Sequence, residues 1–265
     1  MTGKTADSDK TITSAANPAI KRLRALALKK YRDEEGVFMV EGARHVKDAL
    51  HGGWQVDTLV YSHRAKGEPA VAAAKKAHGK CLEVTDDLLS RITGRDNTQA
   101  VVGVFRQRWT PLKDIHHGVW VALEGIRDPG NLGTIMRTAD AVKAEGVLLI
   151  GQVCDIWSPE AVRASMGSFA RVKMARAVLP EFLKWRKDWK GRVVGTHLNT
   201  SVDYRKGDYT QPLLLVMGSE QSGLSADITK ACDQLVKIPM PGGAESLNLA
   251  VSTGVMLYEI CRSKL

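Results

Sequence analysis

The sequence predicts an α/β fold of two consecutive domains, and three observations lead to that prediction. Short apolar runs with strand-like composition alternate with helix-like segments along the chain, as they do in α/β folds. The apolar pattern lapses and charge rises at residues 106–112, and a buried-type strand restarts the pattern at residue 119. The continuous apolar run at residues 213–217 indicates a central strand covered on both faces, which favours a mostly parallel sheet in the second domain.

The smaller first domain is expected at residues 15–105, after a polar tail at 1–14 that has too little apolar surface to fold and is predicted to be disordered. Asn17 and Pro18 have the chemistry of a helix cap and a first helical position, and apolar periodicity carries one helix from there to Arg32. The other elements expected in this domain are strands at 37–40, 54–61, 81–84 and 101–105, a helix ending at His51, and helices at 69–78 and 86–92.

A linker is expected at residues 106–115, followed by a second domain at residues 116–265. The elements expected in the second domain are strands at 119–123, 147–150, 171–174, 192–196, 213–217 and 235–238, helices at 131–144, 158–165 and 180–189, and a last helix that begins near Ser246. Strands that alternate with helices pair in parallel, so their carboxyl ends meet at one edge of the sheet, where ligands bind.

Composition and charge narrow the possible functions. The net charge of +9 and the pI near 9.4 favour an anionic partner, and the excess is concentrated in residues 1–110, which carry 19 Lys and Arg against 13 Asp and Glu. No apolar run approaches the length of a membrane span, and the polar start lacks the apolar core of a secretory signal, so we expect a cytoplasmic protein. The cysteines are widely separated, which argues against a zinc ribbon or a disulfide framework, and we expect no metal.

Three polar, glycine-bearing segments follow expected strands of the second domain, at residues 128–137, 217–224 and 238–248. None has the glycine spacing of a dinucleotide-binding site or a P-loop. In the third segment, Ser246 and Asn248 stand at a helix start, where free backbone N–H groups favour a ligand. Considered alone, Ser246 is better explained as a helix cap.

Together these segments resemble the three motifs of the SpoU (TrmH-like) family of SPOUT RNA 2′-O-methyltransferases. The motif residues are Asn131, Gly133 and Arg137, then Gly218, Glu220, Gly223 and Leu224, then Ile238, Pro239, Met240, Ser246, Leu247 and Asn248. Residues 17–21 and 38–44 are similar to parts of the L30e-like RNA-binding domain that many members carry, and the chain is most like the 23S rRNA ribose methyltransferases that have this domain. Ser219, Gln221 and Pro241 depart from the commoner pattern and loosen any assignment of the RNA.

The resemblance implies a second domain of the SPOUT type, whose chain forms a trefoil knot that holds S-adenosylmethionine. It also implies a homodimer with the active site near the subunit interface. The cofactor would be held largely by backbone groups, and the residues implied are Gly218, Ile238 and Leu247, with Thr196 and Met240 as neighbours.

Methyl transfer to a ribose 2′-hydroxyl requires alignment of that hydroxyl and removal of its proton. We assign Arg137 to the phosphate and 2′-hydroxyl of the target nucleotide, because a guanidinium is a fork of donors suited to phosphate. The resemblance adds a role for this arginine as the base, but a guanidinium pKa above about 12 makes that costly, so we favour positioning, with proton transfer assisted by phosphate or water. The residues expected to orient Arg137 and the ribose are Asn131, Glu220, Ser246 and Asn248. Glu220 has an alternative role as an acid at a helix N-terminus.

RNA binding is expected through basic residues of the first domain. They are Lys21, Arg22, Lys29, Lys30, Arg32, Arg44 and Arg95. A solvated amphipathic helix explains the helical members of this set equally well, and the segment 93–99 around Arg95 is equally explained as a plain loop.

The separate basic domain favours 23S-type rRNA over tRNA as the substrate. Guanosine is the expected target nucleotide, with adenosine and uridine left open. The alternative from another class is a knotted RNA-binding protein that has lost catalysis. Such a protein would be expected to have lost part of the catalytic set, which is complete here: Asn131, Arg137, Glu220 and Asn248.

Overall fold

The computed structural model describes residues 11–264, and the chain divides into two units. The first unit contains the chain up to Gln107 together with the short segment Trp157–Pro159, and the second contains Arg108–Ile156 and Glu160–Leu265. The short segment belongs to the first unit because Trp157 packs into its aromatic cluster, with ring centroids 4.4 Å from Phe38 and 5.8 Å from Trp54. The chain therefore returns once to the first unit after the second has begun.

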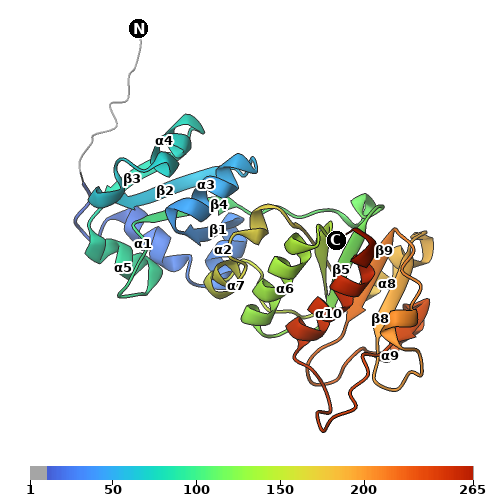
Figure 1. Cartoon of the computed structure of the whole chain (residues 1–265). Coiled ribbons are helices and arrows are strands. Elements are labelled where there is room, and N and C mark those ends of the chain that lie inside the picture. The colour runs from blue at the N-terminus through green and yellow to red at the C-terminus, as the bar shows by residue number, and fades with distance from the viewer. Residues whose placement is uncertain (1–10, 265) are drawn as a thin grey trace. The chain divides into compact units, whose positions relative to one another are not determined.

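A four-stranded mixed sheet forms the centre of the first unit (Figure 1). Its strands are β1 (Val37–Glu41), β2 (Val56–Ser62), β3 (Lys80–Val84) and β4 (Val101–Arg106), in the order β1-β4-β2-β3. Strand β4 runs antiparallel to β1 and β2, whereas β2 and β3 are parallel. Strand β4, from which the chain leaves the first unit, therefore lies between β1 and β2.

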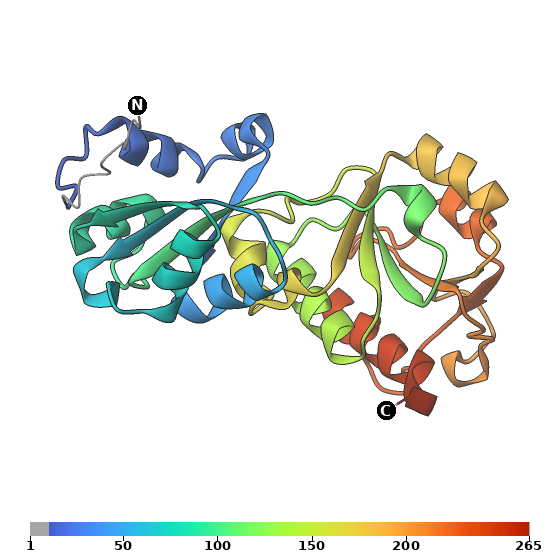
Figure 2. The ribbon, with the colours of Figure 1, turned by 90° about the horizontal axis from the view of Figure 1, so that it is seen from above.

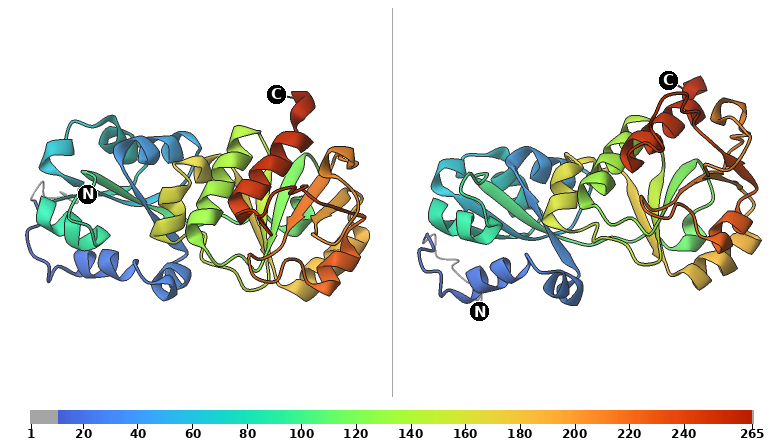
Figure 3. Two further views of the ribbon diagram at one scale, coloured as in Figure 1. Left: turned by 60° about the horizontal axis from the view of Figure 1, so that its bottom comes forward. Right: turned by 90° about the horizontal axis from the view of Figure 1, so that it is seen from below.

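Helices cover both faces of this sheet. They are α1 (Pro18–Ala25), α2 (Lys29–Glu35), α3 (Ala43–His51), α4 (Pro69–Lys76) and α5 (Asp86–Thr93). Helices α1 and α5 bury their apolar sides in one core, which includes Leu23 and Leu89 and the strand residues Val60 and Val104. Helices α3 and α4 contact each other on the opposite face, as Figures 1 and 3 show.

The first helical segment differs from the single helix expected between Pro18 and Arg32. The cap prediction is confirmed, because Asn17 Oδ1 accepts a hydrogen bond from Ala19 N at 2.9 Å with Pro18 at the first position. However, α1 ends at Ala25, and Leu28 is extended before α2 begins. No glycine or proline marks this break in the sequence, which is why periodicity alone missed it.

The ends of the first unit make specific contacts. Of the tail predicted at 1–14, residues 1–10 lie outside the described residues, and Ile12 donates a backbone hydrogen bond to Glu83 O at 2.8 Å. In the segment predicted as a linker, Gln107 N bonds to Gly36 O at 2.8 Å within the first unit. Farther along, Trp109 stacks under the Arg176 guanidinium and Ile115 is buried in the core of the second unit. The predicted linker is thus largely packed against one unit or the other.

The second unit is built on a six-stranded sheet in which every pairing is parallel. The strands are β5 (Val119–Glu124), β6 (Gly146–Ile150), β7 (Lys173–Ala177), β8 (Arg192–Thr196), β9 (Leu213–Met217) and β10 (Gln234–Val236), in the order β10-β8-β9-β5-β6-β7. The predicted parallel sheet is confirmed. The central strand β9 pairs Leu215 with Val121 on one side and with Val194 on the other, and all five of its residues are buried.

Two helical layers enclose the sheet of the second unit (Figure 2). The helices are α6 (Pro129–Ala141), α7 (Pro159–Ala164), α8 (Leu179–Asp188), α9 (Ala226–Ala231) and α10 (Leu249–Ile260). Helices α6 and α10 pack together on one face, and α8 and α9 contact each other on the opposite face. On the α8 side, Phe182 and Ile228 are fully buried against strand residues such as Trp120. Single turns of 3-10 helix complete the chain, at His63–Ala65, Leu112–Asp114, Ser168–Ala170, Tyr204–Lys206 and Arg262–Lys264.

Several predicted boundaries are shifted by a few residues. Helix α6 begins at Pro129 rather than at 131, because Asp128 is its cap and accepts a hydrogen bond from Asn131 N at 2.6 Å. Strand β10 ends at Val236 rather than at 238. The six-residue helix α9 was not expected, although Ser225 caps it and Ile228 is buried, since six residues are too few to show periodicity. Within residues 11–264, no helix is both long enough and apolar enough to span a bilayer.

Candidate active site

A cavity of about 670 Å³ opens in the second unit where strands β8, β9 and β10 end. The segments that line it are residues 196–199, 217–224, 236–238 and 245–249, with Met240 and Ser252. Because the sheet is parallel, these carboxyl ends meet at one edge, which is where open α/β sheets bind ligands. Two of the three segments singled out in the sequence form walls of this cavity.

The turn after β9 has a geometry that only glycine permits at its first position. Ser219 and Gly223 exchange backbone hydrogen bonds of 3.1 and 3.0 Å, so the loop folds back onto its own start. A Cβ atom on Gly218 would lie 2.1 Å from the carbonyl carbon of Gly223, a distance that no rotamer can relieve. Gly223 has a φ of +65°, in the left-handed region that favours glycine. The two glycines thus form a turn whose backbone lines the cavity.

A chain of side-chain hydrogen bonds joins the three sequence segments. Asn131 Nδ2 donates to Glu220 Oε1 at 2.9 Å, and Asn248 Nδ2 donates to Asn131 Oδ1 at 3.0 Å. Asn248 Oδ1 in turn accepts from the backbone N–H groups of Ala250 and Val251, at 2.9 and 3.2 Å. The carboxylate of Glu220 therefore lies at one end of a relay that is anchored at the start of α10.

This geometry corrects two alternative roles proposed from the sequence. Asn248, and not Ser246, caps α10, while Ser246 lies exposed in the loop before the helix. Glu220 does not occupy a helix N-terminus, because it lies within the turn that follows β9. Both asparagines and the glutamate are instead fixed by one another.

Arg137 stands apart from this network. It is exposed on α6, and within residues 11–264 it forms no hydrogen bond or ion pair with another side chain. It follows Asn131 by six residues, which on an α-helix turns the two side chains about 120° apart. The single chain therefore brings together Asn131, Glu220 and Asn248, but it does not bring Arg137 to them.

Two family models match the chain, and together they cover most of it. The model of the SpoU rRNA Methylase family matches residues 118–258, which is more than half of the 265 residues. The chain belongs to the SpoU methylase family. A second model, the MRM3-like substrate binding domain, matches residues 17–103. The first model covers the cavity and the second covers the four-stranded unit.

Relatives of known identity align over nearly the whole length of this SpoU methylase. A 23S rRNA guanosine 2′-O-methyltransferase of Bacillus subtilis is 28% identical over 95% of this chain and 99% of its own. A 23S rRNA uridine 2′-O-methyltransferase of Streptomyces viridochromogenes is 32% identical over 88% of this chain and 85% of its own. The AdoMet-bound crystal structure of an rRNA methyltransferase from Sinorhizobium meliloti is 48% identical, with a TM-score of 0.92 over 97% of this chain and 98% of that chain.

All of the side chains or backbones expected to bind a cofactor in this SpoU methylase line the cavity: Thr196, Gly218, Ile238, Met240 and Leu247. Thr196 Oγ1 donates to Met217 Sδ at 3.5 Å, which turns its hydroxyl toward β9. A third wall was missed from the sequence, namely residues 197–199 directly after β8. The sequence did contain a signal for this wall, because residues 197–199 directly follow a predicted strand of the parallel sheet, at the edge where ligands bind.

Cys154 lies beside the start of α6, but its thiol is unsuited to act as a nucleophile. Burial, together with the nearby carboxylates of Asp128 and Asp155, raises the pKa of Cys154 to about 12. The thiol is therefore protonated at neutral pH. Within residues 11–264, no three His, Cys, Asp or Glu side chains gather closely enough to hold a metal ion.

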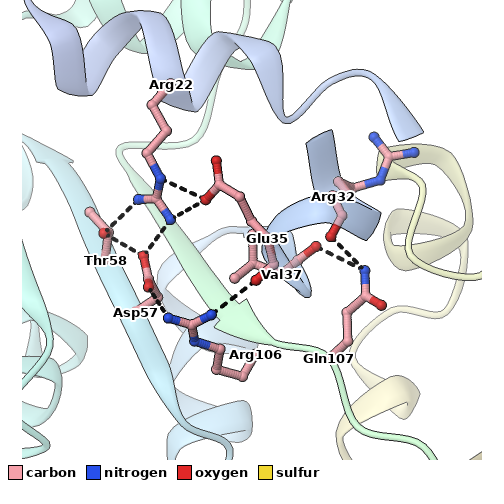
Figure 4. Close-up of polar contacts among 8 residues, drawn as sticks. All are labelled: Arg22, Arg32, Glu35, Val37, Asp57, Thr58, Arg106 and Gln107. Carbon is pink, nitrogen blue, oxygen red and sulfur yellow. Dashed lines mark hydrogen bonds and ion pairs between the residues drawn. The ribbon is translucent and has the colours of Figure 1, made fainter. Parts of the chain in front are cut away.

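The predicted RNA-binding residues of the first unit fall into two groups. Five of them are exposed: Lys21, Lys29, Lys30, Arg44 and Arg95. Arg22 instead bonds to Glu35 at 2.7 Å and to Asp57 at 2.8 Å, as Figure 4 shows. Arg32 is buried, with 3% of its surface exposed, and its guanidinium donates to backbone carbonyls. The prediction that Arg32 belongs to an exposed basic stripe is therefore wrong, because the helix breaks and turns it inward.

Proposed function

We propose that this chain is an S-adenosylmethionine-dependent RNA 2′-O-ribose methyltransferase that acts on 23S-type large-subunit rRNA. The observation that carries the proposal is the relay from Glu220 through Asn131 to Asn248, whose two ends line a cavity at the carboxyl ends of parallel strands. Membership of the SpoU family and near full-length similarity to two 23S rRNA 2′-O-methyltransferases support the same activity.

The chemistry of the cavity fits S-adenosylmethionine. Its walls offer backbone groups at Gly218 and Ile238 and apolar side chains such as Leu198 and Leu247. One lysine and two glutamates line it, so the cavity suits a cationic ligand better than a polyphosphate. When bound, the cofactor supplies a methyl group on an electrophilic sulfonium. We infer that Thr196 and Met240 complete its surroundings.

The residues of the chain act on the ribose and its phosphate. Glu220, held by Asn131, and Asn248 offer an acceptor and a donor that fix the orientation of the target ribose. Arg137 would bind the phosphate and bring the 2′-hydroxyl into line, since a guanidinium matches phosphate geometry. A guanidinium holds its proton too tightly to act as a base, so the proton of the 2′-hydroxyl leaves with the help of phosphate or water. Ser246 would contact the ribose from the exposed loop before α10.

In the single chain, Arg137 lies apart from Asn131, Glu220 and Asn248. We propose a homodimer that places Arg137 at a complete active site. Helix α10 exposes Val251 and Tyr258 at 54% and 52%, and their seven-residue spacing places them on one side of the helix. An apolar helix face of this kind is expected to be covered, and a second copy would bring α6 and α10 of both protomers together. Val251→Glu should therefore convert the dimer to a monomer in analytical ultracentrifugation, and methyl transfer should fall with it. A monomeric wild-type protein that transfers methyl groups would contradict this assembly.

The target nucleotide, the knot and the location of the protein are proposed from the relatives and from the family resemblance. Guanosine is the proposed target, as in the Bacillus subtilis relative, with uridine the alternative set by the Streptomyces relative. We propose a trefoil knot around the cofactor, as the family resemblance implies, and a cytoplasmic location, where rRNA is assembled. A tRNA substrate is the second candidate for the same chemistry, and a non-catalytic RNA-binding protein is the third.

The test is mass-spectrometric mapping of ribose methylation in rRNA from cells with and without the gene. We expect one 2′-O-methyl group to disappear from the large-subunit RNA and to return with the wild-type gene but not with Arg137→Ala. In vitro, purified protein should transfer label from S-adenosylmethionine to the unmodified rRNA. The proposal would be abandoned if neither rRNA nor tRNA accepted label and Arg137→Ala behaved like the wild type. Absence of cofactor binding in calorimetry would favour the non-catalytic protein.

A further inference from the structure

The break between α1 and α2 creates a feature that the predicted single helix would not have. We call residues Leu28, Lys29, Lys30 and Tyr31 the elbow surface. Leu28 has 61% of its surface exposed and Tyr31 has 37%. In the described part of the first unit, these two are the large hydrophobic side chains that face solvent. The large apolar residues of α1, Ile20 and Leu23, are buried, so the exposure of this pair beyond the end of α1 is unusual.

A set of buried and half-buried polar contacts holds the elbow surface in place. Arg32 is almost fully buried, and its Nη1 atom donates to Leu26 O and Ala27 O, both at 2.7 Å. These two carbonyls lie at the break, where helix hydrogen bonding has ended, so the arginine replaces the missing partners. The backbone N–H of Leu28 also donates to Ala25 O at 2.9 Å.

A second set of contacts fixes both helices to the sheet (Figure 4). Arg22 on α1 binds Glu35 at the end of α2 and Asp57 on β2, with ion-pair distances of 2.6 and 2.8 Å. Arg106 on β4 binds the same Asp57 at 3.0 Å and donates to Glu35 O at 2.9 Å. Gln107 Nε2 donates to the carbonyls of Arg32 and Val37. The elbow surface is thus held in a fixed shape by three arginines, Arg22, Arg32 and Arg106.

The chemistry of the elbow surface matches an unpaired nucleotide. A phenol ring offers a face on which any base can stack, and Leu28 provides apolar contact beside it. Lys29 and Lys30 are exposed next to the ring, and Lys30 Nζ lies 5.8 Å from the Tyr31 ring centroid. Lys30 approaches Glu34 only at 3.9 Å, with both side chains mostly exposed, so its ammonium is available to a phosphate. Aromatic platforms flanked by cations are typical of single-stranded RNA binding.

We propose that the elbow surface binds an unpaired base of the RNA substrate, which stacks on Tyr31 beside Leu28 while its flanking phosphates contact Lys29 and Lys30. This inference rests on the proposed function, because it takes the RNA substrate as the ligand, and the match of residues 17–103 to a substrate-binding domain supports the same unit. Arg22 and Arg32, which the sequence assigned to RNA, are then positioning residues that hold the platform.

The experiment uses the full-length protein and three variants of exposed residues. Tyr31→Ala removes the ring, and Tyr31→Phe keeps the ring without the hydroxyl. Val178→Ala is the control, because Val178 is also an exposed apolar residue, at 61%, but lies in the second unit. Filter binding measures affinity for unmodified large-subunit rRNA, for a single-stranded RNA 12-mer of mixed sequence and for its blunt duplex. Thermal melting checks that each variant is folded.

We expect Tyr31→Ala to bind the rRNA and the single strand about tenfold more weakly, the scale of one lost base stack, with little change for the duplex. Tyr31→Phe and Val178→Ala should bind like the wild type. In methyl transfer, Tyr31→Ala should raise KM by a similar factor and leave kcat unchanged. The slope of affinity against salt should also be unchanged, because no phosphate contact is removed.

Three results would overturn the inference. The first is that Tyr31→Ala binds the rRNA and the single-stranded 12-mer with wild-type affinity. The second is equal weakening by Tyr31→Phe, which would point to the hydroxyl and not to stacking. The third is normal binding of bare RNA with weakened binding of ribosomal particles, which would assign the elbow surface to a ribosomal protein. If the wild type transferred no methyl group but its RNA binding still required the Tyr31 ring, the proposed activity would fail while the elbow surface would stand.

Discussion

At the scale of single residues, the shape of the cavity depends on glycine positions at which a Cβ atom would not fit. Gly218 is the clearest case, because its missing Cβ would overlap the peptide unit of Gly223 and Leu224, with Leu224 N at 2.3 Å. The obstacle is backbone, so a side-chain rearrangement cannot relieve it. A motif glycine at this position is therefore explained by the shape of the turn, without any direct contact to a ligand.

Gly218→Ala should abolish cofactor binding or weaken it strongly, because the turn that lines the cavity must open to make room for the alanine side chain. Calorimetry with S-adenosylmethionine measures this directly. The matched control is Gly242→Ala, since a Cβ atom on Gly242 would meet no other atom within 4 Å and this glycine lies in the loop before α10. Equal affinities of the two variants would show that the turn yields without cost.

Asn131 is the central member of the polar relay, because it donates to Glu220 and accepts from Asn248. Asn131→Ala removes both hydrogen bonds, and we expect kcat to fall at least about tenfold. Each bond is partly exposed, so the free energy of unfolding should fall by only about 1–2 kcal/mol. Thr134→Ala, one turn later on the exposed side of α6, is the control. A loss of stability that accounted for all of the lost activity would contradict an orienting role.

At the scale of elements, the ion pairs around Asp57 tie α1, α2, β2 and β4 together. Burial raises the pKa of Asp57, but hydrogen bonds from Arg22 and Thr58 lower it more, so its net pKa lies below the ordinary value of 3.8. A carboxyl group whose pKa is lowered by folding contributes stability above its unfolded pKa, and that contribution is lost as the pH falls through the folded pKa.

The first unit should therefore lose stability as the pH falls below about 4, the unfolded pKa of an aspartate. Asp57→Asn should be less stable than the wild type at pH 7, because Arg22 and Arg106 lose their charged partner, and its stability should change less across the acid range. Denaturant unfolding at a series of pH values provides the measurement. Asp87→Asn is the control, since its pair with Arg91 is exposed on both sides. Parallel acid curves for wild type and Asp57→Asn would refute the assignment.

The same elements show what a sequence pattern can and cannot reveal. Periodicity predicted the strands and the parallel sheet, because burial on both faces leaves a continuous apolar run such as β9. It missed the break after α1, which depends on a buried arginine bonding to carbonyls five and six residues back. It also could not join Asn131 to Glu220, 89 residues away, because only the folded sheet brings those segments to one edge. The second and third motifs line the cavity, as their places after predicted strands suggested, whereas the first motif contributes Asn131 to the polar relay from outside the cavity lining.

At the scale of the whole molecule, the net charge of +9 indicates long-range attraction to RNA, but only some of the cations are free to meet phosphates. Neighbouring residues on α1 show the difference. Lys21 is exposed, whereas Arg22 is only about one third exposed and binds two carboxylates. A count of basic residues therefore overestimates the number of phosphate contacts.

This difference predicts opposite behaviour for two adjacent substitutions. Lys21→Gln should weaken rRNA binding and reduce the slope of log affinity against log salt by about 0.7–0.9, the contribution of one phosphate contact, with an unchanged melting temperature. Arg22→Gln should leave that slope nearly unchanged and lower the melting temperature, because it leaves Glu35 and Asp57 without their shared partner. Filter binding of unmodified rRNA at several salt concentrations, with thermal melting in the same buffers, separates the two effects. If Arg22→Gln reduced the salt slope but kept the wild-type melting temperature, Arg22 would be a phosphate-binding residue and not a residue that holds the elbow surface in place.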